Sequence, residues 1–531
     1  MHSTQHQHLS AASTDEPKPI VWSIAASDSG GGAGIQADTL TIHDLGGHPC
    51  NVVTAITAQN SIHISQLTTS DAAVLTAQLN CLAADMPPKG IKIGVLTSAQ
   101  QVRLLSHWLQ TNLDALAAKL GQSIPVIWDP VMLASNGHML TESTAAPSTS
   151  DYLALAKQVS LITPNYSEFC RLTETNHSEN MHDDWQQQLQ KFVQKTGTNV
   201  LLTGGDQASQ QAVDWLYTEQ IEHTSAKHLQ QLIGFSSHRI ATQHNHGTGC
   251  TYSSGIASAM ALGYPLLDAI CIAKAYVNQG LTAGYAVGQG PGVLSRNGWP
   301  QRLSDFPTII LPAQQSLLLN EKLRFTKVQT PLQVYPVTQS VGVLEQVLAA
   351  GALTVQLRIK GSIEPVELEQ NIKQAIDLGR QYQAQVFIND HWQLAIKHHA
   401  FGVHLGQEDM LEADLKQIAD AGLALGLSSH GYFEILLAAQ RNPSYLAIGH
   451  VFPTPTKSMP SQPQGLSKLS RYGQLLQGKL PLVAIGGINA ENMATIKQSK
   501  IDDIAVVRAI EEAVNPGLSW QNLQHHWQQN Q

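Results

Sequence analysis

The second half of the sequence repeats one pattern eight times, and few folds accommodate that repetition. From Gln333 onward, short apolar runs follow one another, each separated from the next by a segment able to form a helix. The runs are Gln333–Thr338, Leu353–Arg358, Gln385–Asp390, Gly402–Gly406, Leu423–Ser429, Tyr445–Phe452, Pro481–Ile488 and Asp503–Ile510. Eight β/α units in about 200 residues are typical of a compact (β/α)8 TIM barrel, which carries its active site at the carboxyl ends of its strands.

The first half also alternates strands with helices, but in a pattern that indicates an open sheet. The expected strands are Val21–Asp28, Asn51–Ala58, Ile91–Leu96, Pro125–Pro130, Val159–Thr163 and Asn199–Gly204. This order predicts a doubly wound α/β sheet that binds ligands at the carboxyl ends of its strands. Because 531 residues are too many for one ordinary domain, we expect the sheet and the barrel to form separate domains.

Changes in composition along the chain suggest where these domains begin and end. Residues 1–19 contain no apolar core, so they are expected to form a disordered tail and not a signal peptide. Residues 296–330 lose the strand–helix alternation and contain several prolines, which indicates a linker. The predicted domains are therefore residues 20–295 and residues 331–531.

Charge and cysteine content narrow the classes of partner and compartment. The 31 Lys and Arg residues against 40 Asp and Glu residues give a net charge of −9, which argues against nucleic acid or an anionic membrane as a partner. The five scattered cysteines form no C-x-x-C pair, which favours a reducing, cytoplasmic location. The longest apolar region, residues 257–277, is interrupted by Gly263, Pro265, Asp268 and Lys274, so we expect no membrane span. Small molecules are the expected partners, and a homo-oligomer stays open.

A Gly-Thr-Gly turn in the first half has the form of an anion-binding loop. Gly247, Thr248, Gly249 and Cys250 precede a run of small, helix-compatible residues. Such a turn leaves backbone N–H groups unpaired at the positive end of a helix dipole, where they suit a phosphoryl group. A thiol at a helix N-terminus usually has a lowered pKa, so Cys250 is predicted to act as a base. The alternative is a plain glycine-rich turn with a buried cysteine.

Polar residues follow several of the expected strands in the first half. A glycine-rich loop, residues 30–34, leads into a helix on which the Asp38 carboxylate is expected to face back over the loop, or else to lie on a solvated face. Asn165 and Glu168 are three residues apart, one helical turn, and such a pair can hold Mg²⁺ through water near nucleotide phosphates. The alternative for this pair is an N-cap with a surface acid.

Six motifs occur in order within residues 20–295: Gly30–Asp38, Thr57–Asn60, Lys92–Leu96, Asp129–Leu133, Thr163–Glu168 and Asn245–Thr251. Together they resemble the hydroxymethylpyrimidine/phosphomethylpyrimidine kinases of thiamine biosynthesis, which have a ribokinase-like fold. The resemblance implies that the aminopyrimidine is held by Gln59, Gly32, Asp38 and Val95. It implies that Mg²⁺ and ATP phosphates are organised by Asn165, Glu168 and Asp129. Gly247, Thr248, Gly249 and Cys250 would form the anion hole, with Cys250 as the base.

Three residues depart from the pattern of these kinases, and a fourth residue favours a particular branch of the family. Thr203 stands where the family usually has lysine, which removes a cation expected near the phosphates. Ser135 and Asn136 vary a loop that is usually Lys/Thr-Ser-Gly. In sibling pyridoxal and sugar kinases an aspartate occupies the place of Cys250, so the cysteine favours the pyrimidine branch.

Charged residues also gather where the barrel strands are expected to end. Alternation along the second strand puts Gln356, Arg358 and Lys360 on one side, a set suited to a diphosphate. Asp390 and Asp409 follow adjacent strands and can share one Mg²⁺ with substrate phosphates. Taken singly, these residues have ordinary interpretations as rim salt bridges or helix caps, but together they indicate one binding site.

Six motifs run through the second half: Gln356–Lys360, Phe387–Asp390, Gly402–Asp409, Gly426–His430, Gly449–Lys457 and Val483–Ile488. By these motifs the segment is similar to thiamine-phosphate synthases across nearly its whole length. The resemblance implies that hydroxymethylpyrimidine diphosphate is bound by Gln356, Arg358, Lys360, Asn389, Ser428 and Lys457. Asp390 and Asp409 would ligate magnesium, and the thiazole phosphate would be bound by Thr454, Thr456, Gly487, Val507 and Arg508. Arg508 departs from the usual serine.

Three functions are compatible with these patterns. The first is a bifunctional enzyme that phosphorylates hydroxymethylpyrimidine twice with ATP and then couples the diphosphate to thiazole phosphate. The second is a pyridoxal-type kinase fused to a thiazole tautomerase, and Cys250 with the Asp390/Asp409 pair speaks against it. The third is a precursor-binding protein in which one half has lost activity, for which Thr203 is the support. The first is favoured because the product of one half is the substrate of the other.

Overall fold

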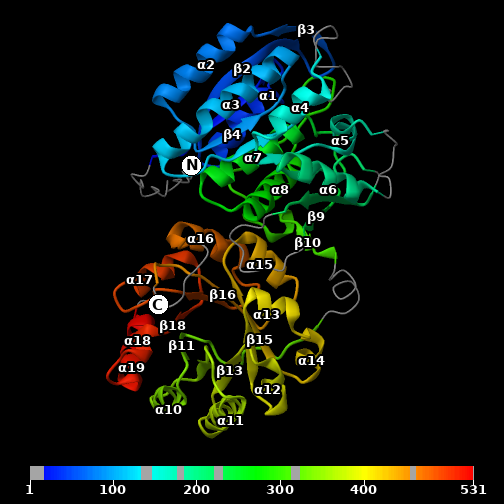
Figure 1. Cartoon of the computed structure of the whole chain (residues 1–531). Helices are drawn as coiled ribbons and strands as arrows, with labels where there is room; N and C mark the ends of the chain where they lie inside the picture. Colours follow the sequence, from blue (N-terminus) through cyan, green and yellow to red (C-terminus); the bar gives the residue numbers. More distant parts are fainter. Residues whose placement is uncertain are drawn as a thin grey trace, which may run out of the picture.

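The computed structural model describes residues 17–132, 146–175, 184–207, 209–219, 231–312, 323–454 and 462–529. Figure 1 shows two domains in succession, an open sheet with its helices and, beyond it, a barrel. The predictions made for Ser135, Asn136, Thr456 and Lys457, and for most of the N-terminal tail, lie outside the described residues.

The first domain is built on a ten-stranded sheet in the order β10-β9-β8-β7-β6-β5-β4-β1-β2-β3. The strands are β1 (Ile20–Ser27), β2 (His48–Gln59), β3 (Ile64–Thr69), β4 (Gly90–Ile93), β5 (Val126–Trp128), β6 (Leu161–Ile162), β7 (Asn199–Leu202), β8 (Gln211–Tyr217), β9 (Leu232–His238) and β10 (Thr308–Ile310). The six strands predicted from sequence are parallel, and β3, β8, β9 and β10 are antiparallel additions. The chain changes direction across the sheet between β1 and β4, the kind of switch point at which such sheets bind ligands.

Helices cover both faces of this sheet because its strands are apolar on both sides. Along β1, Val21 belongs to one buried cluster and Trp22 to the other. The first face packs against α1 (Gly34–Asp44), α7 (Thr248–Ala261) and α8 (Leu266–Thr282). The second packs against α2 (Ala72–Asp85), α3 (Ala99–Leu120), α4 (Thr149–Ala156), α5 (Tyr166–Thr173) and α6 (Trp185–Thr196). This arrangement confirms the doubly wound fold.

The second domain is a closed barrel of eight parallel strands, β11 to β18. They are β11 (Val334–Thr338), β12 (Thr354–Leu357), β13 (Gln385–Asn389), β14 (Gly402–Leu405), β15 (Ala424–Ser429), β16 (Tyr445–Ile448), β17 (Leu482–Ile485) and β18 (Asp503–Val506). The outer elements are α10 (Val341–Ala349), α11 (Pro365–Gln381), α12 (Trp392–Lys397), α13 (Gln407–Glu412), α14 (Leu415–Asp420), α15 (Tyr432–Ala439), α16 (Gly465–Leu476), α17 (Met493–Ile496), η3 (Lys497–Ser499), α18 (Arg508–Glu511) and α19 (Pro516–Gln529). Each of the eight predicted apolar runs contains one strand, so the barrel prediction is confirmed.

Part of the segment predicted as a linker is ordered and joins the first domain. After η1 (Leu303–Asp305), β10 pairs with β9. The pairing buries the side chains of Ile309 and Leu311, which a solvated linker would expose. The same segment contributes Trp299, whose ring lies 3.5 Å from the Arg471 guanidinium of the barrel. The domains therefore share a packed interface, and Figure 1 shows α15 and α16 on the barrel side that faces the first domain.

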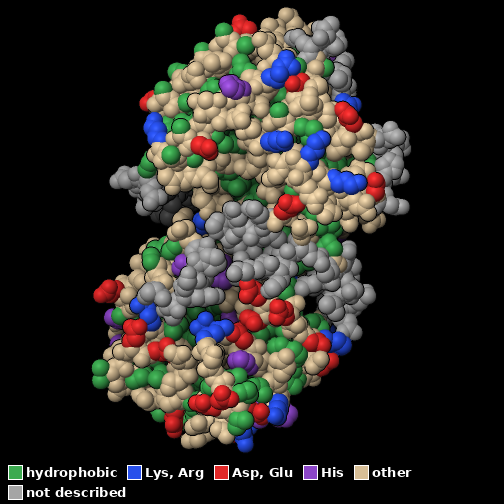
Figure 2. All heavy atoms as spheres, in the orientation of Figure 1, with side chains coloured by type: hydrophobic (Ala, Val, Ile, Leu, Met, Phe, Trp, Pro, Cys, Tyr) green, Lys and Arg blue, Asp and Glu red, His purple; other side chains and the backbone are tan. Residues whose placement is uncertain are grey.

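On the face drawn in Figure 2, acidic and basic side chains are interspersed over both domains. Among the described residues, no helix combines the length and the apolar character needed to cross a bilayer.

Candidate active sites

The first candidate site is a cleft of about 910 Å³ at the carboxyl ends of the parallel strands. Its volume lies in the range of small-molecule sites. The predicted residues that line it are Gln59, Val95, Asp129, Asn165, Glu168, Gly247, Thr248, Gly249 and Cys250. Two predicted residues, Gly32 and Asp38, are not among those that line it.

The glycine-rich loop is wrapped around one carboxylate. Asp28 accepts hydrogen bonds from the backbone amides of Gly30 at 2.8 Å, Gly32 at 3.1 Å and Ala33 at 2.9 Å. His246 Nε2 lies 3.1 Å from the same carboxylate. Burial would raise the pKa of Asp28, but these hydrogen bonds hold it below its ordinary value. Asp28 therefore ties the glycine-rich loop to the loop that precedes α7, a role that the sequence analysis did not assign.

The anion-binding loop depends on a close approach between two glycines. Gly247 precedes α7 with a φ of 82°, and a Cβ atom there would lie 1.9 Å from the carbonyl oxygen of Gly32. A side chain at this position is excluded by sterics and disfavoured by the backbone conformation. The turn thus opens α7 with Gly247, Thr248, Gly249 and Cys250 on the cleft wall, where the Thr248 amide donates to the Asn245 carbonyl at 3.3 Å.

The thiol of Cys250 does not have the lowered pKa that its place at the helix N-terminus predicted. Burial raises the pKa of Cys250 to about 11, and the nearby carboxylates of Asp38 and Asp129 add to the effect. Lys92 acts in the opposite direction without reversing it. The prediction was wrong because desolvation and two negative charges outweigh the helix end.

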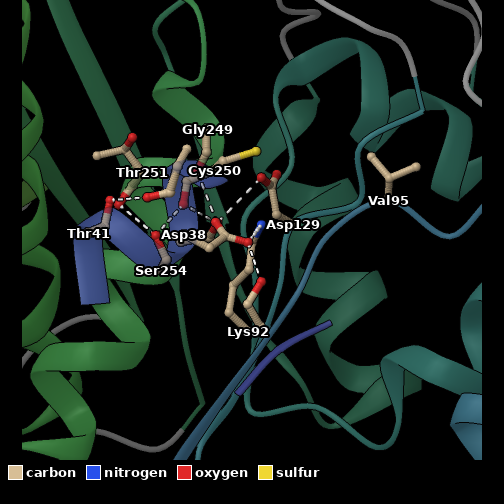
Figure 3. A network of polar contacts seen from close by, with 12 residues as sticks. Asp38, Thr41, Lys92, Val95, Asp129, Gly249, Cys250, Thr251 and Ser254 are labelled. Atoms are coloured by element: carbon tan, nitrogen blue, oxygen red, sulfur yellow. Dashed lines mark hydrogen bonds and ion pairs between the residues drawn. The ribbon is translucent and has the colours of Figure 1, made fainter. Parts of the chain in front are cut away.

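Asp38 lies beneath the cleft and not on its wall. It is fully buried, its Oδ2 atom accepts a hydrogen bond from Ser23 at 2.6 Å, and it forms a 2.8 Å ion pair with Lys92. Figure 3 shows Asp38, Lys92 and Asp129 gathered beside Cys250, with Val95 set apart. The structure therefore does not bring Asp38 to the expected substrate position, and the solvated alternative fails as well. The buried face of α1, which includes Ala37 and Thr41, turns Asp38 toward the sheet.

Replacing Lys92 with methionine is expected to destabilise the first domain strongly. The change leaves the Asp38 carboxylate buried without its cation, a loss that typically lowers the free energy of unfolding by about 3–5 kcal/mol. Urea unfolding, followed by tryptophan fluorescence, measures the change in the free energy of unfolding. The double variant Lys92→Met with Asp38→Leu removes both charges and should be more stable than the single variant. A single variant as stable as the wild type would contradict this account of the pair.

Asn165 and Glu168 form the capping box of α5 while they line the cleft. The Asn165 side chain accepts from the Glu168 amide, and the Glu168 side chain accepts from the Asn165 amide, both at 2.9 Å. Burial, followed by the charge of Asp129, raises the pKa of Glu168 to about 8. The pKa of Asp129 is raised to about 6, also by burial first. The N-cap alternative is thus observed, but Glu168 is no surface acid, and the burial of the two carboxyls favours their protonated forms.

A second group of cleft residues was missed by the sequence analysis. Lys274 Nζ lies 2.7 Å from Asp214 Oδ2, and Tyr252 donates to the same oxygen at 2.8 Å. The other oxygen of Asp214 accepts from the amide of Gly204, next to Thr203. Lys274 was visible in the sequence only as an interruption of an apolar run. Asp214 gave no signal because it lies on an antiparallel strand that was not predicted.

The second candidate site is a pocket of about 460 Å³ at the carboxyl rim of the barrel. Predicted residues from several strands line it together: Gln356, Arg358, Lys360, Asn389, Asp390, Asp409, Ser428, Thr454, Gly487, Val507 and Arg508. The placement of Gln356, Arg358 and Lys360 on one side follows the predicted alternation. Thr456 and Lys457 lie outside the described residues.

Two carboxylates and a lysine meet at the rim of this pocket. Lys360 Nζ contacts Asp390 Oδ2. Burial raises the pKa of Asp409, and the charge and hydrogen bond of Asp390 raise it further. The two carboxyls are therefore close enough to interact, as the sequence analysis expected for a shared cation.

The floor of the pocket is a buried polar network that the sequence analysis did not predict. His404 Nδ1 lies 2.7 Å from Tyr445 Oη, and His404 Nε2 lies 2.8 Å from Ser428 Oγ. Burial lowers the pKa of His404 to about 4, so the imidazole is neutral at neutral pH. Gln356 joins the network through Tyr335, to which its amide donates at 3.2 Å. The pocket thus offers neutral hydrogen-bonding groups at its floor and cations at its rim.

The loop after β17 has the backbone of an anion seat. Gly486 and Gly487 have φ values of 102° and 68°. A Cβ atom on Gly486 would lie 2.4 Å from the Cβ of His450, so the loop requires glycine. Arg508 at the start of α18 and Glu512, the residue after its end, line the same pocket as Gly487 and Asn489. The predicted phosphate-binding residues that the structure describes therefore share one pocket.

Comparisons with known proteins give separate results for the two halves. Residues 28–295 match the family described as phosphomethylpyrimidine kinase, and residues 332–510 match the family described as thiamine monophosphate synthase. A thiamine-phosphate synthase of Pectobacterium atrosepticum is 49% identical over 195 residues, which are 37% of this chain and 91% of that protein.

Two solved structures are also similar. A pyridoxal kinase from Staphylococcus aureus, in complex with pyridoxal, covers 56% of this chain and 98% of its own, with a TM-score of 0.45 and 21% identity. A phosphomethylpyrimidine kinase from Clostridium difficile covers 49% of this chain and 98% of its own, with a TM-score of 0.38 and 28% identity.

Proposed function

The chain belongs to the phosphomethylpyrimidine kinase family in its first half and to the thiamine-phosphate synthase family in its second, and from this premise we propose how its two pockets divide the work. It is a bifunctional enzyme of thiamine biosynthesis, a phosphotransferase joined to a diphosphorylase. The cleft of the first domain phosphorylates hydroxymethylpyrimidine and its monophosphate with ATP. The barrel couples the resulting diphosphate to thiazole phosphate and releases pyrophosphate.

In the kinase cleft, we assign pyrimidine binding to Gln59 and Val95, which line the wall nearest the ends of β2 and β4. The amides of the Gly247–Cys250 turn stabilise the charge on the transferred phosphoryl group, because preorganised donors cost no reorganisation during the reaction. Cys250 accepts the hydroxymethyl proton. With a pKa of about 11, little thiolate is present at neutral pH, but the thiolate that forms is strongly basic.

The acidic residues of both pockets fit magnesium. In the kinase cleft, burial raises the pKa values of Glu168 and Asp129 to about 8 and about 6, and a cation bound beside them would favour their ionised forms. In the barrel, Asp390 and Asp409 are the corresponding pair. Mg²⁺ typically takes one or two carboxylates together with substrate phosphates, and its charge would offset theirs.

In the barrel pocket, we assign the diphosphate to the cations Arg358 and Lys360 at the rim. The aminopyrimidine lies deeper, against the neutral groups of Gln356, Asn389 and Ser428. Lys457 is assigned to the residues that bind the diphosphate because of its place in the Gly449–Lys457 motif. The bond between the pyrimidine methylene carbon and the diphosphate oxygen breaks, and the thiazole nitrogen then bonds to that carbon. No protein nucleophile is required, since the cations and the exclusion of water stabilise the separated charges.

We assign the thiazole phosphate to Thr454, Gly487 and the backbone at Val507, which line the same pocket, with Thr456 added from its motif. Arg508, which stands where the family usually has serine, adds a cation to this pocket, and the added charge favours a phosphate.

The observation that carries this proposal is the presence of carboxylates and cations in one barrel pocket, Asp390 and Asp409 with Arg358 and Lys360. The test supplies the diphosphate and thiazole phosphate and measures pyrophosphate with and without Mg²⁺. Release that depends on Mg²⁺ and matches thiamine phosphate supports the synthase. A thiazole tautomerase, the alternative for this half, would neither release pyrophosphate nor need magnesium.

We assign the kinase to residues 20–295 with the addition of β10, and the synthase to residues 331–531. Five free cysteines suit a cytoplasmic enzyme. Its partners are the small-molecule substrates named above, and a homo-oligomer stays open.

A further inference from the structure

Helix α15 belongs to the synthase barrel, but the kinase domain holds it at both ends. At its N-terminus, the amide of Phe433 donates to Asp268 Oδ1 of the kinase at 2.8 Å, and the amide of Tyr432 donates to the same carboxylate. At the other end, Gln440 exchanges two hydrogen bonds with the backbone of Ile309 in β10, at 2.7 and 2.9 Å. The helix is thus attached to the kinase domain at both ends, and at its N-terminal end the rings of Tyr432 and Phe433 also pack against Phe306 and Phe235.

The contact at the N-terminus is a helix cap supplied by another domain. The N-cap residue of α15 is Gly431, which has no side chain to offer. A Cβ atom at this position would lie 2.1 Å from Asp268 Oδ2, so the glycine leaves room for the carboxylate. Burial raises the pKa of Asp268 to about 6, and the carboxylate is still ionised at neutral pH. A negative charge at this end is favourable because it faces the positive end of the helix dipole.

The capped turn also places part of the synthase pocket. Ser428 and His430 line that pocket and immediately precede the turn. The His430 backbone amide and its Nδ1 atom each lie 2.8 Å from Glu434 Oε2 on the first turn of α15. Only three residues separate His430 from Glu434. A shift of the first turn of α15 therefore moves His430 and with it the pocket wall that His430 forms.

On the kinase side, Asp268 stands on a helix that is itself firmly placed. It lies in the first turn of α8, which is buried along most of its length. Lys274, Val277 and Asn278 of the same helix line the kinase cleft. The position of Asp268 is thus set by the core of the kinase domain and not by a mobile surface loop.

We propose that Asp268 of the kinase domain is a positioning residue for the synthase, holding the first turn of α15 so that His430 forms the wall of the diphosphate pocket. This inference rests on the proposed function of the barrel. It makes the binding of the pyrimidine diphosphate dependent on a residue of the other domain.

The test uses the full chain with Asp268→Ala and, as the conservative variant, Asp268→Asn, whose amide oxygen still accepts hydrogen bonds. The synthase is assayed with pyrimidine diphosphate supplied directly, so that kinase turnover does not enter. We expect Asp268→Ala to raise the KM for the diphosphate about tenfold, as a lost helix cap would, while kcat changes less than about twofold. In Asp268→Asn, the KM for the diphosphate is expected to return most of the way to the wild-type value.

The matched control is Gln440→Ala, which removes the contact at the far end of the same helix. Its KM is expected to stay within about twofold of the wild type, because it does not touch the turn that carries His430. Kinase activity on hydroxymethylpyrimidine reports folding of the first domain in every variant and should be unchanged. An unchanged KM in Asp268→Ala overturns the inference, and so does an equal rise in Gln440→Ala or no recovery in Asp268→Asn. A wild-type chain that makes no thiamine phosphate would instead refute the proposed function.

Discussion

Replacing Cys250 with alanine is expected to lower the rate of both phosphorylation steps by about 100- to 10,000-fold, the range for loss of a general base. The synthase reaction should keep its full rate, because Cys250 lies in the kinase cleft and does not line the barrel pocket. ADP formation with hydroxymethylpyrimidine measures the first effect. Thiamine phosphate formation from supplied diphosphate measures the second.

A matched control for this variant is Cys81→Ala, because Cys81 is an exposed cysteine on α2 and is not among the cleft residues. It should retain both activities. If Cys250→Ala kept near-normal kinase activity, Cys250 would not be the base, and the amides of its loop would carry that site alone. If it lost both activities with the fold intact, the assignment of two separate sites would be wrong.

Replacing Asp409 with alanine is expected to reduce the coupling reaction by at least about 100-fold and to leave the kinase steps unchanged. Asp409 and Asp390 interact at the rim of the barrel pocket, and the loss of one carboxylate weakens the place proposed for magnesium beside the diphosphate. Pyrophosphate release from supplied diphosphate, measured over a range of Mg²⁺ concentrations, gives the size of the effect.

Glu412→Gln serves as the control for this second variant. Glu412 is the exposed last residue of α13, the helix that carries Asp409. Its loss removes one negative charge from the same helix without changing the pocket. Full activity in Asp409→Ala would remove this carboxylate from the proposed metal site.

The architecture was predictable because buried parallel strands have a simple signature. Each strand of the barrel is a short apolar run between polar connections, and runs such as Tyr445–Phe452 and Pro481–Ile488 each contain one. The carboxyl ends of parallel barrel strands meet at one rim. Arg358 and Asp390 each end one of the apolar runs, so the sequence alone placed them in one pocket, which both line.

The antiparallel strands of the first domain were missed because their sequence signal is weaker. β8, Gln211–Tyr217, has a buried aspartate, Asp214, at its centre. Burial of that residue makes sense only once Lys274 of α8 is seen beside it. Asp214 and Lys274 are 60 positions apart, and sequence patterns over a few neighbouring residues do not predict an ion pair between such positions. Neither residue was therefore assigned to the cleft.

The predictions for Cys250 and Asp38 were wrong because the sequence does not show the environment of either side chain. The prediction for Cys250 considered the helix end but not the burial and the two carboxylates that raise its pKa. The prediction for Asp38 assumed that a residue one turn into α1 faces back over the loop, whereas the buried face of that helix turns it toward Lys92. Both depend on neighbours that come from distant parts of the chain.

The most direct test of the account is to give the whole protein hydroxymethylpyrimidine, Mg-ATP and thiazole phosphate, and to measure thiamine phosphate, ADP and pyrophosphate together. If one pocket prepares the substrate of the other, thiamine phosphate forms, with two ADP and one pyrophosphate for each molecule made. ATP consumption without thiamine phosphate, or thiamine phosphate that forms only when the diphosphate is added from outside, would contradict it.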